Sequence, residues 1–391
     1  MRLKIIIITI LFINYFCGQA QVTPTLFHNN LSNGIQFGNG MDMEIYNNEL
    51  YMSVTSAGKI VKVSLASPNS TVVDVVTGLT APAGLKIVGN ELYFLQKSNA
   101  ALEEYTGKLS KINVSLANPP VVDLYSGLMY PYKIDVNGTN VYVAEEYLEG
   151  NHGENHMHIS MINLSGVPTK TDLYNYFSHV DDFEFKDNFL YIIDRDKTTD
   201  KSRILKLDVT NGASNTPFIY YDDVHGDFFN EGVIHNNYLY LNSETNPSVV
   251  SRINLNSDTP TTSLAVSGFD FNGNTPSIEG MIADENNNLY FIGKYSNGTT
   301  STFMIYKANV STLATQDFTK TSKVTLYPNP SADFISFSNL ENEEGYQIVS
   351  IDGKIVKKGN VGSDEKINVS HFTSGVYTIR VGNKSFKFIK Q

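Results

Sequence analysis

Four acidic residues recur at one place in a repeated pattern of this 391-residue chain. Counted eight residues back from a recurring Leu-Tyr pair, or ten where the turn is taken to be two residues longer, they are Asp42, Asp182, Glu231 and Glu279. Carboxylates brought close together raise one another's pKa, and a bound divalent cation removes that penalty. Hard oxygen ligands suit calcium, so the pattern predicts a Ca²⁺ site. The alternative is four acids that only face water.

Lys133 stands at the same place in another copy of the pattern, and Gly84 in the remaining one. An ammonium among these acids would offset one charge, and Lys133 could instead contact a bound ligand. Two residues further along each copy stand Lys86, Asp135 and Glu184, which would form a second tier.

Six copies of one element must bring these positions together. The anchors of the copies are Leu50-Tyr51, Leu92-Tyr93, Val141-Tyr142, Leu190-Tyr191, Leu239-Tyr240 and Leu289-Tyr290, spaced by 42, 49, 49, 49 and 50 residues. Each copy alternates apolar and polar residues over four strand-length runs joined by Asn, Asp and Gly turns. Four antiparallel strands make one propeller blade, so the sequence predicts an all-β, six-bladed β-propeller. The inner strands of such a fold converge on one axis.

The sixth copy has no convincing fourth strand after Val310. Residues 25–31 resemble the fourth strands of the other copies. We therefore predict that this N-terminal segment completes the sixth blade, which pairs the two ends of the propeller and removes an open sheet edge.

Residues 1–20 have the pattern of a cleaved signal peptide, with Arg2 and Lys4 before an apolar run at 5–16 that is too short to span a membrane. The only cysteine, Cys17, lies within it, so the mature chain forms no disulfide. That chain keeps 27 basic and 40 acidic residues, a net charge of −13. This balance argues against nucleic acid and anionic membranes as partners, and no transmembrane segment remains after cleavage.

A second group of candidate ligands lies in the third copy. It includes Glu145 and Glu146, followed by His156 and His158. Two histidines at a spacing of two share one face of a strand and could bind a transition metal or another ligand. Most histidine-containing loops bind nothing, so both interpretations stay open.

The pattern changes after a polar linker at 316–323, and residues 324–391 are predicted to form a small Ig-like β-sandwich. Its motif residues are Tyr327, Pro328, Asn329, Pro330, Gly353, Gly375 and Tyr377, and the chain ends on a basic, apolar segment. In this order the motifs resemble the type A C-terminal sorting domain of type IX secretion. The resemblance implies export by the type IX secretion machinery of a Bacteroidetes-type cell, with release or attachment at the outer-membrane surface.

Residues 21–315 resemble six-bladed propellers of the TolB-like, NHL and gluconolactonase (SMP-30) kinds in blade pattern alone. In the lactonases an acid, an Asn and an Asp hold a divalent metal, and no Asn occupies an equivalent place here. Two functions follow as alternatives. One is a secreted module that binds an unknown extracellular ligand or partner, and the other is a metal-dependent hydrolase of lactones or phosphate esters.

Overall fold

The computed structural model describes residues 21–31, 41–97, 106–148, 155–196, 198–210, 216–222, 228–243, 248–315, 324–338, 340, 343–350, 354–381 and 384–391. The predicted signal peptide at 1–20, the linker at 316–323 and Gly353 lie outside these residues. The chain separates into two compact units, residues 1–315 and 316–391. None of the helices within the described ranges has the length and apolarity to cross a membrane.

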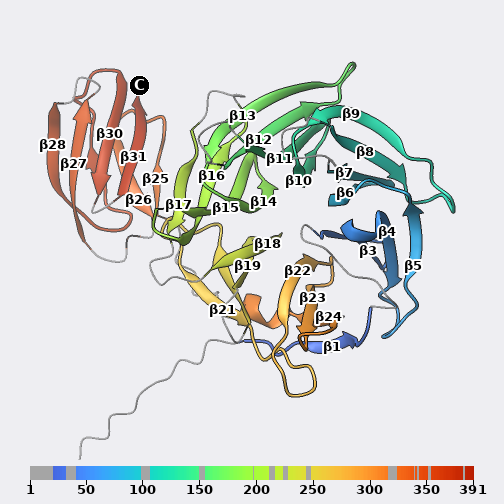
Figure 1. The fold of residues 1–391 in the computed structure, drawn as a ribbon. Helices are drawn as coiled ribbons and strands as arrows, with labels where there is room; N and C mark the ends of the chain where they lie inside the picture. The colour runs from blue at the N-terminus through green and yellow to red at the C-terminus, as the bar shows by residue number, and fades with distance from the viewer. Residues whose placement is uncertain are drawn as a thin grey trace, which may run out of the picture. The chain divides into compact units, whose positions relative to one another are not determined.

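The first unit is built from six four-stranded antiparallel sheets, seen as a ring in Figure 1. Blade 1 contains β2 (Met43–Tyr46), β3 (Glu49–Val54), β4 (Lys59–Ser64) and β5 (Val73–Thr77), and blade 2 contains β6 (Pro82–Val88), β7 (Glu91–Gln96), β8 (Gly107–Asn113) and β9 (Val122–Leu128). Blade 3 contains β10 (Pro131–Asn137), β11 (Asn140–Leu148), β12 (Asn155–Asn163) and β13 (Thr169–Phe177), and blade 4 contains β14 (Val180–Lys186), β15 (Phe189–Asp196), β16 (Lys201–Asp208) and β17 (Phe218–Asp222). Blade 5 contains β18 (Phe229–His235), β19 (Tyr238–Ser243), β20 (Val249–Asn254) and β21 (Thr262–Val266), and blade 6 contains β22 (Ser277–Ala283), β23 (Asn288–Ser296), β24 (Ser301–Asn309) and β1 (Thr25–His28). Two 3₁₀ helices are also described, η1 (Thr55–Ala57) and η3 (Ser311–Thr315).

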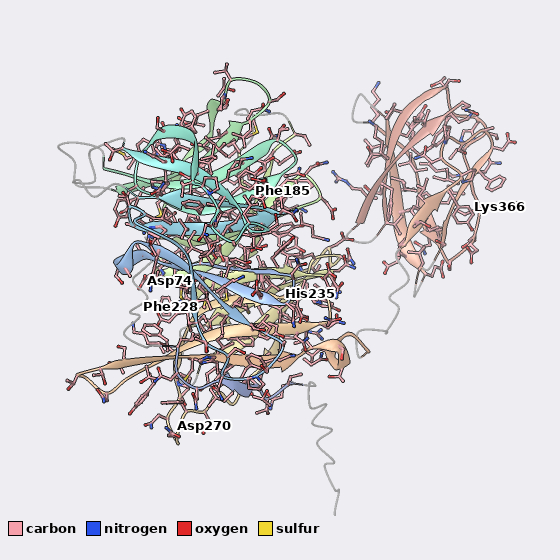
Figure 2. The ribbon with its side chains drawn as sticks, turned by 90° about the vertical axis from the view of Figure 1, so that its right-hand side faces the viewer. Asp74, Phe185, Phe228, His235, Asp270 and Lys366 are labelled. Atoms are coloured by element: carbon pink, nitrogen blue, oxygen red, sulfur yellow. The ribbon has the colours of Figure 1, made fainter. Side chains whose placement is uncertain are left out.

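The first strand of each blade faces the centre of the ring. These strands contact one another in the closed cycle β2, β6, β10, β14, β18, β22 and back to β2. The predicted six-bladed propeller is therefore confirmed. Residues at the start of these strands meet at one end of the axis, which we call the mouth. Phe228, which precedes β18, and His235, the last residue of β18, are far apart along this direction in Figure 2.

The sixth blade closes as the sequence predicts. β1 pairs antiparallel with β24, with Thr25 opposite Lys307 and Leu26 opposite Tyr306. The Phe27 ring packs edge-on against Tyr290, with centroids 6.0 Å apart. The N-terminal strand thus covers the outer edge of the blade that is formed last along the chain.

Apolar side chains fill the space between neighbouring blades. The first residue of every Leu-Tyr anchor is completely buried, and one cluster joins Tyr51 and Ile60 of blade 1 to Leu85 and Phe94 of blade 2. Neighbouring blades share such clusters, so a blade gains its core only from its neighbours.

The second unit is a two-layer β-sandwich, as predicted. One sheet has the order β25 (Thr325–Tyr327), β26 (Phe334–Ser338), β29 (Ile367–Asn368), and the other has the order β28 (Ile355–Val361), β27 (Glu344–Ser350), β30 (Gly375–Val381), β31 (Lys384–Lys390). Its core includes Phe337 from the first sheet and Ile348, Ile379 and Phe388 from the second, all fully buried.

Candidate functional site

Three of the four predicted acids surround one lysine at the mouth. The Lys133 ammonium lies 3.1 Å from Asp182 Oδ1, 3.3 Å from Asp42 Oδ1 and 3.4 Å from Glu231 Oε2. Asp182 is fully buried, and the other two acidic side chains are less than a fifth exposed. A single cation from blade 3 therefore contacts carboxylates of blades 1, 4 and 5.

This arrangement does not fit a resident calcium ion. Calcium takes six to eight oxygen ligands at about 2.3–2.6 Å, and the point equidistant from these three carboxylates holds the Lys133 ammonium instead. Across the described ranges no group of three or more His, Cys, Asp or Glu side chains has a geometry suited to a metal ion. In this arrangement the counterion of the acids belongs to the chain itself.

A second lysine forms a tier two residues deeper along the inner strands. The Lys86 ammonium lies 3.1 Å from Asp135 Oδ1 and 3.5 Å from Glu44 Oε1. Glu184, also predicted for this tier, acts on Lys86 through its charge. The sequence reasoning missed Glu44, although it lies two residues after Asp42, the same offset that relates Asp182 to Glu184.

Burial and charge shift the pKa values of both tiers. Burial lowers the pKa of each lysine, but the acids around Lys86 and Lys133 outweigh it and hold both pKa values well above the usual one. Burial raises the pKa of Glu44 to about 7, against the opposing effect of Lys86. The pKa values of Asp182, Glu184 and Glu231 are raised for the same reason. The two tiers therefore retain protons at a pH where ordinary carboxyls have lost them.

Three aspartates of these tiers also bind neighbouring blades together. Asp42 Oδ2 accepts a hydrogen bond from the Leu85 amide at 2.8 Å, joining blades 1 and 2. Asp135 Oδ2 accepts one from Phe185 at 2.8 Å and Asp182 Oδ2 one from Gly232 at 2.9 Å, joining blade 3 to 4 and blade 4 to 5. In each case the Oδ1 atom of the aspartate accepts a hydrogen bond from the backbone amide of the residue that follows it in the sequence. These interblade clasps give the acids a structural role that needs no ligand.

Glu279 does not join the group at the mouth. Gly280, opposite Ile292, occupies the place that Glu231, opposite Asn242, has in blade 5, whereas Glu279 lies at a β-bulge between Ile278 and Gly280. Its carboxylate accepts a hydrogen bond from Ser277 Oγ at 2.7 Å and is a third exposed. The register places the position of Gly280 nine residues before the anchor Leu289, against eight before Leu239 in blade 5, so blade 6 has one extra residue and not two as assumed from the sequence.

The histidine candidates lie on an extended hairpin. β11 and β12 stay paired from Asn140 opposite Asn163 to Leu148 opposite Asn155, so both histidine positions lie within β12. His158 is nearly buried, and its ring stacks on Tyr147 with centroids 3.8 Å apart. The side chain of His156 lies outside what the structure describes. Whether the pair binds a ligand stays a prediction.

Aromatic and charged residues of blades 2 to 5 lie at the mouth, and three of them stand three residues before the lysine–carboxylate tier. Tyr130, His179 and Phe228 stand at equivalent places in blades 3, 4 and 5, each 49 residues from the next. Lys97 directly follows β7, and Glu146 and Arg195 lie near the ends of β11 and β15, the second strands of blades 3 and 4, with the same spacing of 49 residues. We call these six residues the mouth rim. Of these six residues the sequence analysis named only Glu146 as a candidate, although the 49-residue period relates the members of each set of three.

Contacts across blade boundaries order the mouth rim. The Lys97 ammonium lies 4.9 Å from the centre of the Tyr130 ring, and the Arg195 guanidinium lies 5.2 Å from that of Phe228. Each is a cation–π contact from one blade to the next. His179 Nε2 lies 3.1 Å from Asp181 Oδ1, and this hydrogen bond raises the pKa of His179. Burial lowers the pKa of Lys97.

The C-terminal motif residues lie in the second unit. Tyr327 ends β25, and its hydroxyl donates to Asp364 Oδ1 at 2.7 Å. Gly375 begins β30, and the buried Tyr377 hydroxyl donates to the Thr373 carbonyl at 2.9 Å. Residues 325–391 match the family described as the secretion system C-terminal sorting domain. The C-terminal unit is a type IX sorting domain. The chain is accordingly handled by the type IX secretion machinery and is exported to the cell surface or beyond it.

Comparison with solved structures supports the fold of the first unit. A luciferin-regenerating enzyme matches with a TM-score of 0.50 and 9% identity, covering 73% of this chain and 95% of its own. A calcium-binding regucalcin from Agrobacterium tumefaciens matches with a TM-score of 0.50 and 10% identity over the same shares. At this identity the likeness concerns the fold alone. No curated protein matches the chain in sequence.

Proposed function

We propose that the propeller is a secreted binding module that contacts its extracellular ligand or partner through the mouth rim. The observation that carries the proposal is the alternation of aromatic and charged side chains at equivalent places of successive blades. Flat aromatic rings beside both signs of charge offer apolar contact and hydrogen bonding without a metal, as binding surfaces of proteins commonly do.

The tier beneath the rim favours binding over metal-dependent hydrolysis. A hydrolase of lactones or phosphate esters would need Asp42, Asp182 and Glu231 as ligands of a divalent ion that polarises the substrate. These carboxylates instead contact Lys133, and Asp42 and Asp182 also accept the amides of neighbouring blades. The hydrolase is therefore the alternative that this geometry supports less well.

The test is a binding screen of the full mature chain against immobilised glycans and peptides. Tyr130→Ala and Phe228→Ala should weaken any binding found by roughly tenfold or more, as expected for aromatic residues in a contact surface. Tyr176→Ala is the matched control, because Tyr176 is 72% exposed on the outer strand β13. Equal effects of all three substitutions, or turnover of a lactone or phosphate ester that requires added calcium, would contradict the proposal.

A further inference from the structure

The Asn329 side chain holds the last strand of the chain. Its Nδ2 donates to the Lys387 carbonyl at 3.0 Å, and its Oδ1 accepts the Ile389 amide at 2.9 Å. Two residues later the backbone continues the pattern. The Ser331 amide donates to the Ile389 carbonyl at 2.8 Å, and the Gln391 amide donates to the Ser331 carbonyl at 2.9 Å. Four hydrogen bonds thus follow one another along residues 387–391.

These bonds lie on the free edge of a sheet. β31 is the last strand of the order β28-β27-β30-β31, so β30 is its only neighbouring strand in that sheet, and on its other side Ser331 forms an isolated parallel bridge with Lys390. The backbone groups on its other side would otherwise face water and could accept a strand from another chain. Residues 329–331 occupy that side, so the motif that begins at Tyr327 acts as a short cover for the C-terminal strand.

Both ends of this cover are fixed to the rest of the sandwich. Tyr327 donates its hydroxyl to Asp364 at 2.7 Å, while Ser331 is buried and donates its hydroxyl to the Phe334 carbonyl at 2.6 Å. Within β31 itself, Phe388 is fully buried and Lys390 nearly so. Both polar atoms of the Asn329 amide are engaged by β31, although the residue as a whole is exposed.

We infer that Asn329 is a positioning residue of the sorting signal: it holds β31 in place, and its effect on export passes through the C-terminal strand. An exposed motif read directly by the secretion machinery would keep its amide available for that contact. Here the amide forms two hydrogen bonds inside the domain. This inference rests on the sorting domain and is independent of the proposed function of the propeller.

The experiment compares export with the order of β31 in the full chain, produced in a bacterium that has a type IX secretion system. Asn329→Ala should raise the exchange rate of the Ile389 amide by roughly tenfold and lower the exported fraction, because both bonds to the strand are lost. Asn329→Asp keeps an acceptor for the Ile389 amide, so its exchange rate and its exported fraction should both lie between those of Asn329→Ala and those of the natural chain. Asn360→Ala, an exposed substitution on the opposite edge strand β28, should change neither quantity.

Across these variants the exported fraction must follow the protection of the Ile389 amide from hydrogen exchange. The amide of the buried Ile379 is the reference, because it stays protected as long as the domain is folded. Reduced export with an unchanged Ile389 amide would show that the motif is contacted directly and would overturn the inference. Full export despite an unprotected Ile389 would overturn it as well. If Asn329→Ala also exposes Ile379, the comparison of Asn329→Asp with Asn360→Ala decides by the same criterion.

Discussion

The ammonium of Lys133 lies 3.1 Å from the buried carboxylate of Asp182, and the same ammonium reaches Asp42 and Glu231 within 3.4 Å. One side chain of blade 3 is therefore a shared counterion for acids from three other blades at the propeller axis. A buried charge is tolerated when its counterion is close and its remaining atoms are hydrogen-bonded, and both conditions hold for Asp182.

Replacing this lysine should convert the mouth into a cation site. Lys133→Met removes the counterion of three acids, and we expect a loss of about 3–5 kcal/mol of unfolding free energy. Added calcium should then raise the melting temperature of the variant, because the ion binds only its folded state. The natural chain should respond neither to calcium nor to chelator.

Thermal melting of both proteins with calcium and with chelator measures these effects. Lys294→Met is the control, since Lys294 is a third exposed and lies 3.8 Å from Glu279. A natural chain that melts earlier in chelator would show a resident metal and contradict the expectation.

The interblade clasps should contribute more to stability than surface pairs that look similar. Asp135→Ala deletes the acceptor of the Phe185 amide and one counterion of Lys86, so we expect a loss of about 2–4 kcal/mol. Asp74→Ala removes a half-exposed partner of Lys59 and should cost less than about 1 kcal/mol. Urea unfolding of the two variants compares them, and equal losses would argue against a clasp.

Stability should fall as the pH rises from about 5 to 8. The pKa of Glu44 is about 7 in the folded chain, above the ordinary glutamate value of 4.5, so the folded state binds more protons than the unfolded chain between these two values. The contribution is present in full below the unfolded pKa and is lost as the pH passes the folded one, for a total of about 3 kcal/mol. Asp182, Glu184 and Glu231 act in the same direction.

Glu44→Gln should flatten this pH dependence and raise the stability at pH 8, which denaturant unfolding at several pH values can measure. Its charged neighbours are Lys86, Asp42 and Asp135, and they remain in the variant. Glu285→Gln, in an exposed turn, is the control and should leave the profile unchanged. Stability that rises from pH 5 to 8 would contradict the assignment.

Blade 3 offers a test of how burial changes the value of an ion pair. Lys170 lies 2.5 Å from Glu145, which is fully buried and also accepts the Met129 amide and the Ser160 hydroxyl. Lys170→Met leaves this carboxylate without its counterion, and we expect a loss of about 3–5 kcal/mol. Lys62→Met breaks a 2.7 Å ion pair with Glu49. Both side chains of this pair are about a third exposed, so the substitution should cost less than about 1 kcal/mol of unfolding free energy. Similar losses for the two variants would refute the distinction.

The architecture could be predicted from the sequence because each blade of a propeller repeats the same sequence pattern at a similar spacing. The six Leu-Tyr anchors indicated six blades. The missing fourth strand after Val310 led to the prediction that the N-terminal segment completes the sixth blade, which the pairing of β1 with β24 confirms. The sandwich strands followed from short alternating runs between Gly and Asn turns. None of these inferences needed the conformation of a single side chain.

The site could be predicted only in part, because its chemistry depends on side-chain geometry. Asp42, Asp182 and Glu231 do converge, yet the sequence could not tell that Lys133 would contact all three instead of offsetting one charge. Nor could it show that Asp42 and Asp182 accept backbone amides of neighbouring blades. Glu279 was misplaced because one extra residue, not two, precedes the anchor in blade 6, which puts Gly280 at the inner position and Glu279 at a β-bulge.

The pairing of β1 with β24 also sets the timing of folding. Thr25 and Lys307 are 282 residues apart, so the sixth blade joins the earliest and the latest parts of the propeller. Contacts of such long sequence separation form slowly, and until β1 arrives the outer edge of β24 is open to strands of other molecules. The period in which this protein is most exposed to aggregation is therefore the interval between completion of five blades and closure of the sixth.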